Sequence, residues 1–95
     1  VAYAAARHIT VVPEIDVPGH AQAAVAAYPE HGVVDGPTLP SANWGVNPYL
    51  FNPREETLQF LENILAEVLE MFPGQYIHIG GDEAVKYQWQ DSPQV

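Results

Sequence analysis

Cysteine is absent from this 95-residue chain, and basic residues are scarce. The lack of cysteine excludes disulfides and thiolate metal sites, and it is compatible with either an oxidising or a reducing compartment. Three Lys and Arg residues against twelve Asp and Glu residues give a formal charge of −9. Binding to a nucleic-acid backbone needs basic residues that displace counterions, so we expect no nucleic-acid partner.

Long apolar runs are also missing. No stretch approaches the roughly 20 apolar residues that cross a bilayer, and no basic cluster would hold an anionic membrane. Residues 1–7 have the composition of a helix end, but no capping residue precedes them. We therefore expect the chain to begin inside a structural element, so the lack of a secretion signal leaves the compartment open.

The apolar residues that are present, 47% of the chain, fall in short segments. Residues 9–15 are rich in β-branched side chains and predict a strand buried on both faces, as in a parallel sheet. Pro13 is expected at a bulge or at the frayed end of this strand. Asp16 follows the strand directly, and His20 follows the turn formed by residues 17–19.

Residues 17–52 are predicted to form a long loop that contains one short helix. The alanine-rich stretch 20–28 favours that helix, which should end before Pro29. Three aromatic residues lie in the loop: Trp44, Tyr49 and Phe51. They could stack on the apolar face of a sugar or pack the loop onto the fold, and we favour the packing role. No role is assigned to Trp89.

An amphipathic helix is predicted over residues 53–72, because apolar residues recur there at spacings of three and four. Asn52 can cap it, Pro53 suits its first position and Glu55 can complete a capping box. A second strand follows over residues 76–80.

Strand, helix and strand in this order form a βαβ unit, so the two strands should be parallel. Their carboxyl ends then lie on one side, where Asp16 and His20 would meet Asp82 and Glu83. A bend at the two glycines before Asp82 would turn both acids inward. Two neighbouring carboxyl groups in one pocket favour one protonated acid and one carboxylate, which suits general acid catalysis.

The residues alone leave two alternatives open. Asp16 and His20 could merely cap the short helix. The cluster also offers ligands for zinc or manganese: Asp16, His20, His78, Asp82 and Glu83. A metal site is disfavoured because we expect His78 to be buried and hydrogen-bonded within the sheet. His8 and His31 are isolated, and we treat both as surface or structural residues.

Two motifs carry a resemblance to a known family. They are Pro-Glu-Ile-Asp-Val-Pro-Gly-His at residues 13–20 and His-Ile-Gly-Gly-Asp-Glu at residues 78–83. Over nearly its whole length the chain resembles family 20 glycoside hydrolases, the β-N-acetylhexosaminidases. The resemblance implies an α/β fold that is part of a (β/α)8 TIM barrel, with its third and fourth strands and the helix between them.

The resemblance also implies a retaining, substrate-assisted mechanism, in which the 2-acetamido oxygen of the substrate is the nucleophile. Glu83 would be the general acid and base, and Asp82 would hold the acetamido group. Asp16 would support Asp82, and His20 would support Glu83. No cofactor or metal is required on this interpretation.

The substrate implied is an oligosaccharide or glycoconjugate that ends in N-acetylhexosamine, and the compartment implied is secreted, periplasmic or lysosomal. Two strands cannot close a barrel, so we expect the isolated chain to be inactive and partly unfolded or aggregating. The other class that remains open is a non-catalytic carbohydrate-binding barrel. Sugar preference, linkage and oligomeric state are not determined by these residues.

Overall fold

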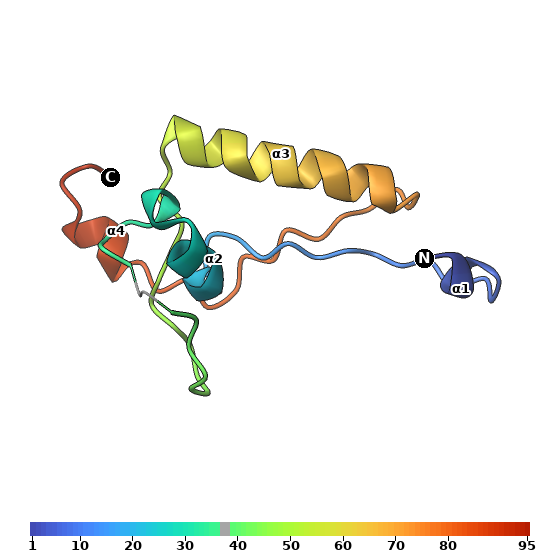
Figure 1. Ribbon diagram of the computed structural model, residues 1–95, viewed down its shortest axis with the longest axis horizontal. Helices are drawn as coiled ribbons and strands as arrows, with labels where there is room; N and C mark the ends of the chain where they lie inside the picture. The colour runs from blue at the N-terminus through green and yellow to red at the C-terminus, as the bar shows by residue number, and fades with distance from the viewer. Residues whose placement is uncertain (37–38) are drawn as a thin grey trace.

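The computed structural model describes residues 1–36 and 39–95, and its regular elements within these ranges are helical (Figure 1). The elements are α1 (Ala2–Ala5), α2 (Gln22–Ala27), the 3-10 helix η1 (Pro29–His31), α3 (Glu55–Met71) and α4 (Tyr87–Asp91). Helix α3 runs along one side of the molecule above two extended segments, with α2, η1 and α4 gathered at one end and α1 at the other. None of the described helices is long and apolar enough to cross a membrane.

The two extended segments pair in parallel, as the βαβ order predicts. A parallel bridge joins Glu14 to His78. The His78 amide donates to the Pro13 carbonyl at 2.9 Å, and the Ile15 amide donates to the His78 carbonyl at 2.9 Å. The structure has one bridge here rather than the continuous strands expected over residues 9–15 and 76–80. Among residues 1–36 and 39–95, each segment pairs with one other extended segment, so its other edge lacks the second ladder of hydrogen bonds that a strand inside a sheet makes.

The pairing ends at Gly80. The Gly80 amide donates to Nδ1 of His78 at 3.1 Å, and the Val17 amide donates to the Ile79 carbonyl at 3.1 Å. Gly80 and Gly81 then adopt φ values of 66° and 107°, in the left-handed region that glycine enters without steric cost. The ring of His78 therefore helps to stop the pairing and to start the bend that leads to the acidic residues.

The prediction that His78 is buried is wrong. Its side chain is 61% exposed, although it is hydrogen-bonded as expected. Burial of a side chain on a paired segment requires a second layer over that face of the sheet. The described residues place α3 over one face only of the extended pair (Figure 1).

Helix α3 begins later than the sequence predicts, and without a capping box. Its first residue is Glu55, its N-cap is Arg54, and no side chain makes a cap hydrogen bond at that position. Asn52 does not cap the helix; its Oδ1 accepts the Arg54 amide at 3.1 Å, which closes the turn before the helix. Pro53 thus lies before the helix, in the turn that Asn52 closes.

A buried polar network around Asn52 joins α3 to η1. Its amide nitrogen donates to the carbonyls of Glu30 and Gly32, each at 2.9 Å. Its Oδ1 also accepts the Thr57 hydroxyl at 2.6 Å, and Thr57 Oγ1 lies 3.0 Å from Nδ1 of His31. Because the Thr57 proton is directed to Asn52, His31 must donate from Nδ1. His31 is therefore a structural residue, one of the two roles expected for it.

The hydrophobic core is small and lies at the α2 end. Ala21, Val25 and Phe51 are its buried members, with partly buried neighbours from α2 and α3 packed against them. Under α3, an apolar groove of about 250 Å³ remains open toward the extended pair. Five leucine and isoleucine side chains contribute to it: Ile15, Leu58, Leu61, Leu65 and Ile79. Much of the apolar face of α3 thus lines a groove instead of filling a core.

Candidate active site

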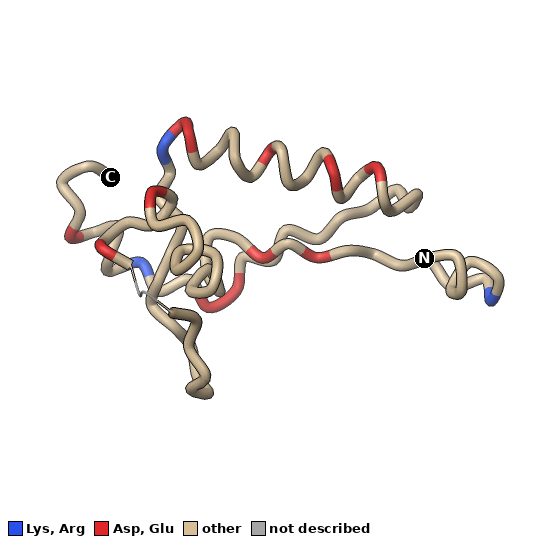
Figure 2. The backbone as a smooth tube through the Cα atoms, viewed as in Figure 1, with Lys and Arg blue, Asp and Glu red and all other residues tan. Residues whose placement is uncertain are grey.

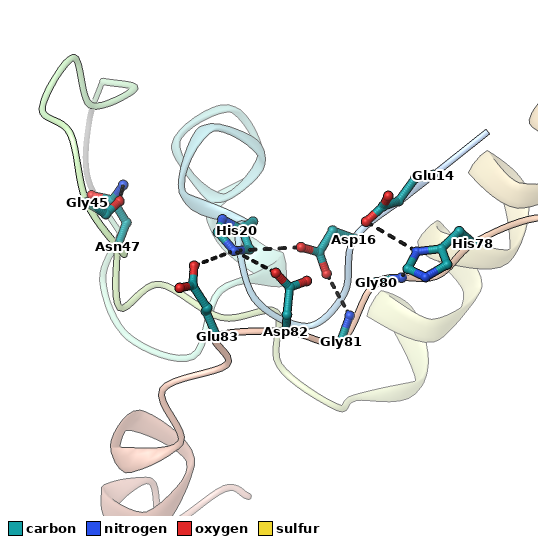
Figure 3. Close-up of polar contacts among 10 residues, drawn as sticks. All are labelled: Glu14, Asp16, His20, Gly45, Asn47, His78, Gly80, Gly81, Asp82 and Glu83. Carbon is teal, nitrogen blue, oxygen red and sulfur yellow. Dashed lines mark hydrogen bonds and ion pairs between the residues drawn. The ribbon is translucent and has the colours of Figure 1, made fainter. Parts of the chain in front are cut away.

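The four residues predicted to converge do so at the end of the paired segments (Figure 3). Asp16 follows the first segment and His20 stands just before α2. Asp82 and Glu83 follow the two glycines after the second segment. Nε2 of His20 lies at the centre of the group, 3.3 Å from Oε2 of Glu83, 3.8 Å from Oδ2 of Asp16 and 3.9 Å from Oδ2 of Asp82. Glu83 is therefore the nearest carboxylate to the imidazole.

Asp16 fixes the bend that leads to the two acids. Its Oδ1 accepts the Gly81 amide at 2.8 Å, and only 19% of its side chain is exposed. A Cβ added at Gly80 would overlap the Asp16 carboxylate, so the side chain fits against a position that has none. Asp16 thus holds the peptide between Gly80 and Gly81, one residue before Asp82.

Gly19 allows the two loops of the site to approach each other. It is buried, and a Cβ there would lie 3.2 Å from the Asp82 carbonyl and 3.4 Å from Cα of Ala84. The turn before His20 therefore packs directly on the backbone of the acidic pair. This close approach brings the imidazole beside Glu83.

Asp16 and His20 do not cap α2, so the helix-cap alternative is wrong. The N-cap is Ala21, and α2 has no side-chain cap hydrogen bond. His20 and Glu83 both adopt φ of 50°, a left-handed conformation that costs a non-glycine residue roughly 1–2 kcal/mol. Strained backbone of this kind persists where its surroundings impose it, and it is concentrated at functional sites.

The two acids are open to solvent, with side chains 68% exposed for Asp82 and 55% for Glu83. The chain has three basic residues, Arg7, Arg54 and Lys86, and they stand apart from this acidic cluster (Figure 2). Among the described residues, His20 is the only cation-forming side chain in contact with these carboxylates. The imidazole of His20 is therefore the group around which the three carboxylates gather.

Part of the cluster could also hold a cation. Donor atoms of Asp16, His20 and Asp82 all lie within 4.8 Å of one another. His78 stands outside this group, because its Nδ1 accepts the Gly80 amide and lies 3.3 Å from Oε1 of Glu14. Nδ1 cannot accept that hydrogen bond and donate to Glu14 at the same time, so the 3.3 Å separation is a contact and not a second hydrogen bond.

The aromatic residues of the long loop have different roles. Phe51 is buried in the core, and its carbonyl accepts the indole N–H of Trp89 at 2.9 Å, which gives Trp89 an anchoring role. Tyr49 is partly buried. Trp44 departs from the expected packing role, because its side chain is fully exposed and lines a hollow together with His20 and Glu83.

Sequence reasoning missed three contributors to this region: Gly19, Glu14 and the exposure of Trp44. Gly19 belongs to the first motif, and a glycine between proline and histidine is a signal of close backbone approach. Glu14 alternates with Asp16 along an extended segment, so both side chains share a face. No local sequence pattern distinguishes the exposed Trp44 from the buried Phe51.

A parallel pair, a connecting helix and a carboxylate cluster at the carboxyl ends of the pair are the elements of a β/α catalytic domain. Residues 1–95 match glycosyl hydrolase family 20, catalytic domain, and the chain belongs to this family. The catalytic domain of the family is a TIM barrel.

Relatives of known name agree with this assignment. The chain is 43% identical over 90 residues to a beta-hexosaminidase of Porphyromonas gingivalis, covering 94% of this chain and 12% of the relative. It is 42% identical over 95 residues to a beta-hexosaminidase of Vibrio furnissii, covering 98% of this chain and 16% of the relative.

Two solved structures also match the chain. A crystal structure of a beta-N-acetylhexosaminidase superposes with a TM-score of 0.92 at 41% identity, covering 98% of this chain and 20% of that one. A chitobiase of Flavobacterium johnsoniae superposes with a TM-score of 0.92 at 40% identity, covering 98% and 14% respectively. The chain thus spans 12–20% of the length of these proteins.

Proposed function

We propose that the whole protein to which this chain belongs hydrolyses terminal β-linked N-acetylhexosamine residues by a retaining, substrate-assisted mechanism. The observation that carries the proposal is the placement of Asp82 and Glu83 beside one imidazole, with Glu83 nearest at 3.3 Å. Membership of family 20 and the names of the relatives support the substrate class.

The proposed roles are those that the resemblance to family 20 implies for the matching residues, and the geometry of the site is compatible with them. Glu83 donates a proton to the leaving oxygen while the C1–O bond breaks and the acetamido oxygen of the substrate bonds to C1. Asp82 accepts a hydrogen bond from the acetamido N–H and stabilises the positive charge that develops on that group. Glu83 then removes a proton from water, which attacks C1 and restores the acetamido group.

Two residues position these acids. His20 contacts the carboxylate of Glu83, and it can stabilise the negative charge that Glu83 acquires after it gives up its proton. Asp16 accepts the Gly81 amide at 2.8 Å and so holds the Gly80–Gly81 peptide that leads to Asp82. Neither residue needs to touch the substrate in this scheme.

Within the barrel, we assign the extended segments to the third and fourth strands, with α3 between them. On this assignment the remaining strands carry the other walls of the sugar pocket. The high exposure of Asp82 and Glu83 fits a pocket whose other walls come from those strands, since a pocket that excludes water must cover both side chains.

The test is Glu83→Gln in the full-length protein, assayed on a chromogenic N-acetyl-β-glucosaminide. Loss of a general acid lowers kcat roughly 10²- to 10⁴-fold. The matched control is Glu67→Gln, an exposed position on α3, which should retain normal turnover. Normal turnover by the Glu83 variant would contradict the proposal.

The same assay separates the competing functions. A substrate with a 2-hydroxyl in place of the acetamido group should not be cleaved, because it lacks the nucleophile. If the donor group of Asp16, His20 and Asp82 instead holds a catalytic metal, activity should disappear with a chelator and return with added metal. Binding of an N-acetyl sugar without turnover would indicate a non-catalytic barrel.

A further inference from the structure

Two consecutive amides in the bend before the acidic pair are each held by a side chain (Figure 3). The Gly81 amide donates to Oδ1 of Asp16 at 2.8 Å, and the Gly80 amide donates to Nδ1 of His78 at 3.1 Å. The carboxylate of Asp16 belongs to the candidate site. The ring of His78 has no part in the proposed mechanism, although it holds the same bend.

His78 lies on the same face of the extended pair as Asp16. Ile15 and Ile79 line the groove under α3, and side chains alternate between the two faces along an extended segment. Glu14, Asp16 and His78 therefore lie on the face away from α3. In a β/α barrel the helices form the outer ring, so this face is the inner one. Glu14 and His78, which the parallel bridge joins, thus stand inside the barrel one layer below the candidate site.

Nδ1 of His78 has two neighbours that make opposite demands on it. The Gly80 amide needs an acceptor there, whereas Oε1 of Glu14, 3.3 Å away, needs a donor. A neutral ring can offer a lone pair at Nδ1 and accept the amide, but a protonated ring carries a hydrogen on both nitrogens and can only donate. Protonation of the ring therefore exchanges the hydrogen bond from Gly80 for an ion pair with Glu14.

The charges around the ring favour this exchange. Among the described residues, Glu14 is the only carboxylate in ion-pair contact with His78. Asp16 shares the face, but its carboxylate is engaged by the bend and by His20. Glu62 of α3 lines the groove on the opposite face. Glu14 is therefore the group that stabilises a proton on this ring.

We propose that His78 is a positioning residue for Asp82 and Glu83, that it acts only while its ring is neutral, and that Glu14 takes over its Nδ1 when the ring is protonated. This inference rests on the proposed function, because its effect is measured on the reaction of the two acids. Loss of the hydrogen bond from Gly80 releases the bend that leads to both of them. His78 itself does not touch the substrate.

The test is the pH profile of kcat for the full-length protein on a chromogenic N-acetyl-β-glucosaminide. Histidine ordinarily changes charge between about pH 5 and 8, so kcat should fall on the acid side as the ring gains its proton. His78→Asn keeps an acceptor, because the amide oxygen of asparagine can stand where Nδ1 stands, and it does not titrate. It should retain most of kcat near pH 8 and move the acid limb of the profile down by about one pH unit.

His78→Ala has no acceptor for the Gly80 amide. It should lower kcat near pH 8 by roughly 10- to 100-fold, because the acids are no longer held in place. The comparison with His78→Asn separates the acceptor from the volume of the ring.

Glu14→Gln keeps the shape of the side chain and removes the charge that stabilises the protonated ring. It should also move the acid limb to lower pH. The matched control is Glu70→Gln, an exposed position on α3, which removes the same charge and should leave the profile in place. Glu14→Gln decides the outcome if the His78 variants do not fold.

Acid limbs of His78→Asn and Glu14→Gln that coincide with the limb of the unsubstituted protein would overturn the proposal. A His78→Asn protein as slow near pH 8 as His78→Ala, or a His78→Ala protein with full kcat, would overturn it as well. The hydrolase would survive these results as long as Glu83→Gln abolishes turnover. Normal turnover by the Glu83 variant would overturn the proposed function itself.

Discussion

Gly80 takes part both in the bend of the backbone and in the placement of Asp16, which contacts the candidate site. Its φ of 66° is accessible to other residues at a modest cost, but the Asp16 carboxylate occupies the space where a Cβ would stand. Asp16 in turn holds the Gly81 amide. A side chain at Gly80 would therefore move the group that orients the acidic pair.

Gly80→Ala should lower kcat of the full-length protein on an N-acetylhexosaminide by roughly 100-fold, because a displacement of about 1 Å at a catalytic group has that effect. Gly81→Ala is the matched control, since Gly81 also has a positive φ but a Cβ there meets no atom within 4 Å. Its effect should be a loss of thermal stability with a much smaller change in kcat. Equal losses of kcat in both variants would assign the effect to backbone strain and not to Asp16.

At this scale the sequence predicts some residues well and others poorly. Asp16, His20, Asp82 and Glu83 could be placed together because two motifs end two parallel segments, and the structure does bring them together. The exposure of Trp44 could not be predicted. Burial of Phe51 depends on contacts with the core around α2, and no local pattern encodes which aromatic side chain makes them.

Among the elements, the junction between η1 and α3 depends on one side chain. Asn52 is 2% exposed and serves four hydrogen bonds, two as donor and two as acceptor. Its removal would take a partner from the Glu30 and Gly32 carbonyls and from the Arg54 amide, and would leave the Thr57 hydroxyl with His31 alone. Each buried polar group left unpaired costs roughly 1–3 kcal/mol.

Asn52→Ala should therefore destabilise the full-length protein by about 3 kcal/mol, measured as a shift in its denaturant unfolding midpoint at unchanged slope. The control is Asn63→Ala, an exposed residue of α3 whose side chain only accepts from Gln59 at 3.3 Å. Its effect should stay within about 0.5 kcal/mol. A destabilisation by Asn52→Ala that is no larger than the control's would mean that water satisfies the network.

The elements themselves were predictable to different degrees. The apolar spacing of α3 indicates a helix over 53–72, and the observed helix is Glu55–Met71. Its first turn differs because Asn52 bonds to η1, a long-range contact that capping patterns do not include. The predicted parallel pairing of the extended segments is confirmed. How many residues form regular strand depends also on neighbouring strands, which the described residues do not supply.

For the molecule as a whole, the surface is large for its mass. The accessible area is 6787 Å², whereas a compact monomer of 10.4 kDa exposes about 5,400 Å². The radius of gyration is 15.3 Å, against about 12 Å for a compact domain of this length. The groove under α3 is one place where apolar surface remains uncovered.

We expect the isolated 95-residue chain to unfold without a cooperative thermal transition, to bind a hydrophobic dye and to release no sugar from a chromogenic N-acetylhexosaminide. The physical reason is that its few buried apolar side chains cannot offset the entropy of ordering the chain. Calorimetry and light scattering on the purified chain, with the full-length protein as control, measure this. A monomer with a sharp transition, or turnover abolished by Glu83→Gln, would contradict it.

The pairing of Asp16 with Gly81 spans 65 positions of the chain. At synthesis rates of 5–20 residues per second, the segment with Asp16 waits roughly 3 to 13 seconds on the ribosome before its partner is made. During that interval the first segment has an open edge that other extended chains can pair with. The candidate site is therefore assembled late, and its first half is exposed to chaperones and to mispairing before its second half exists.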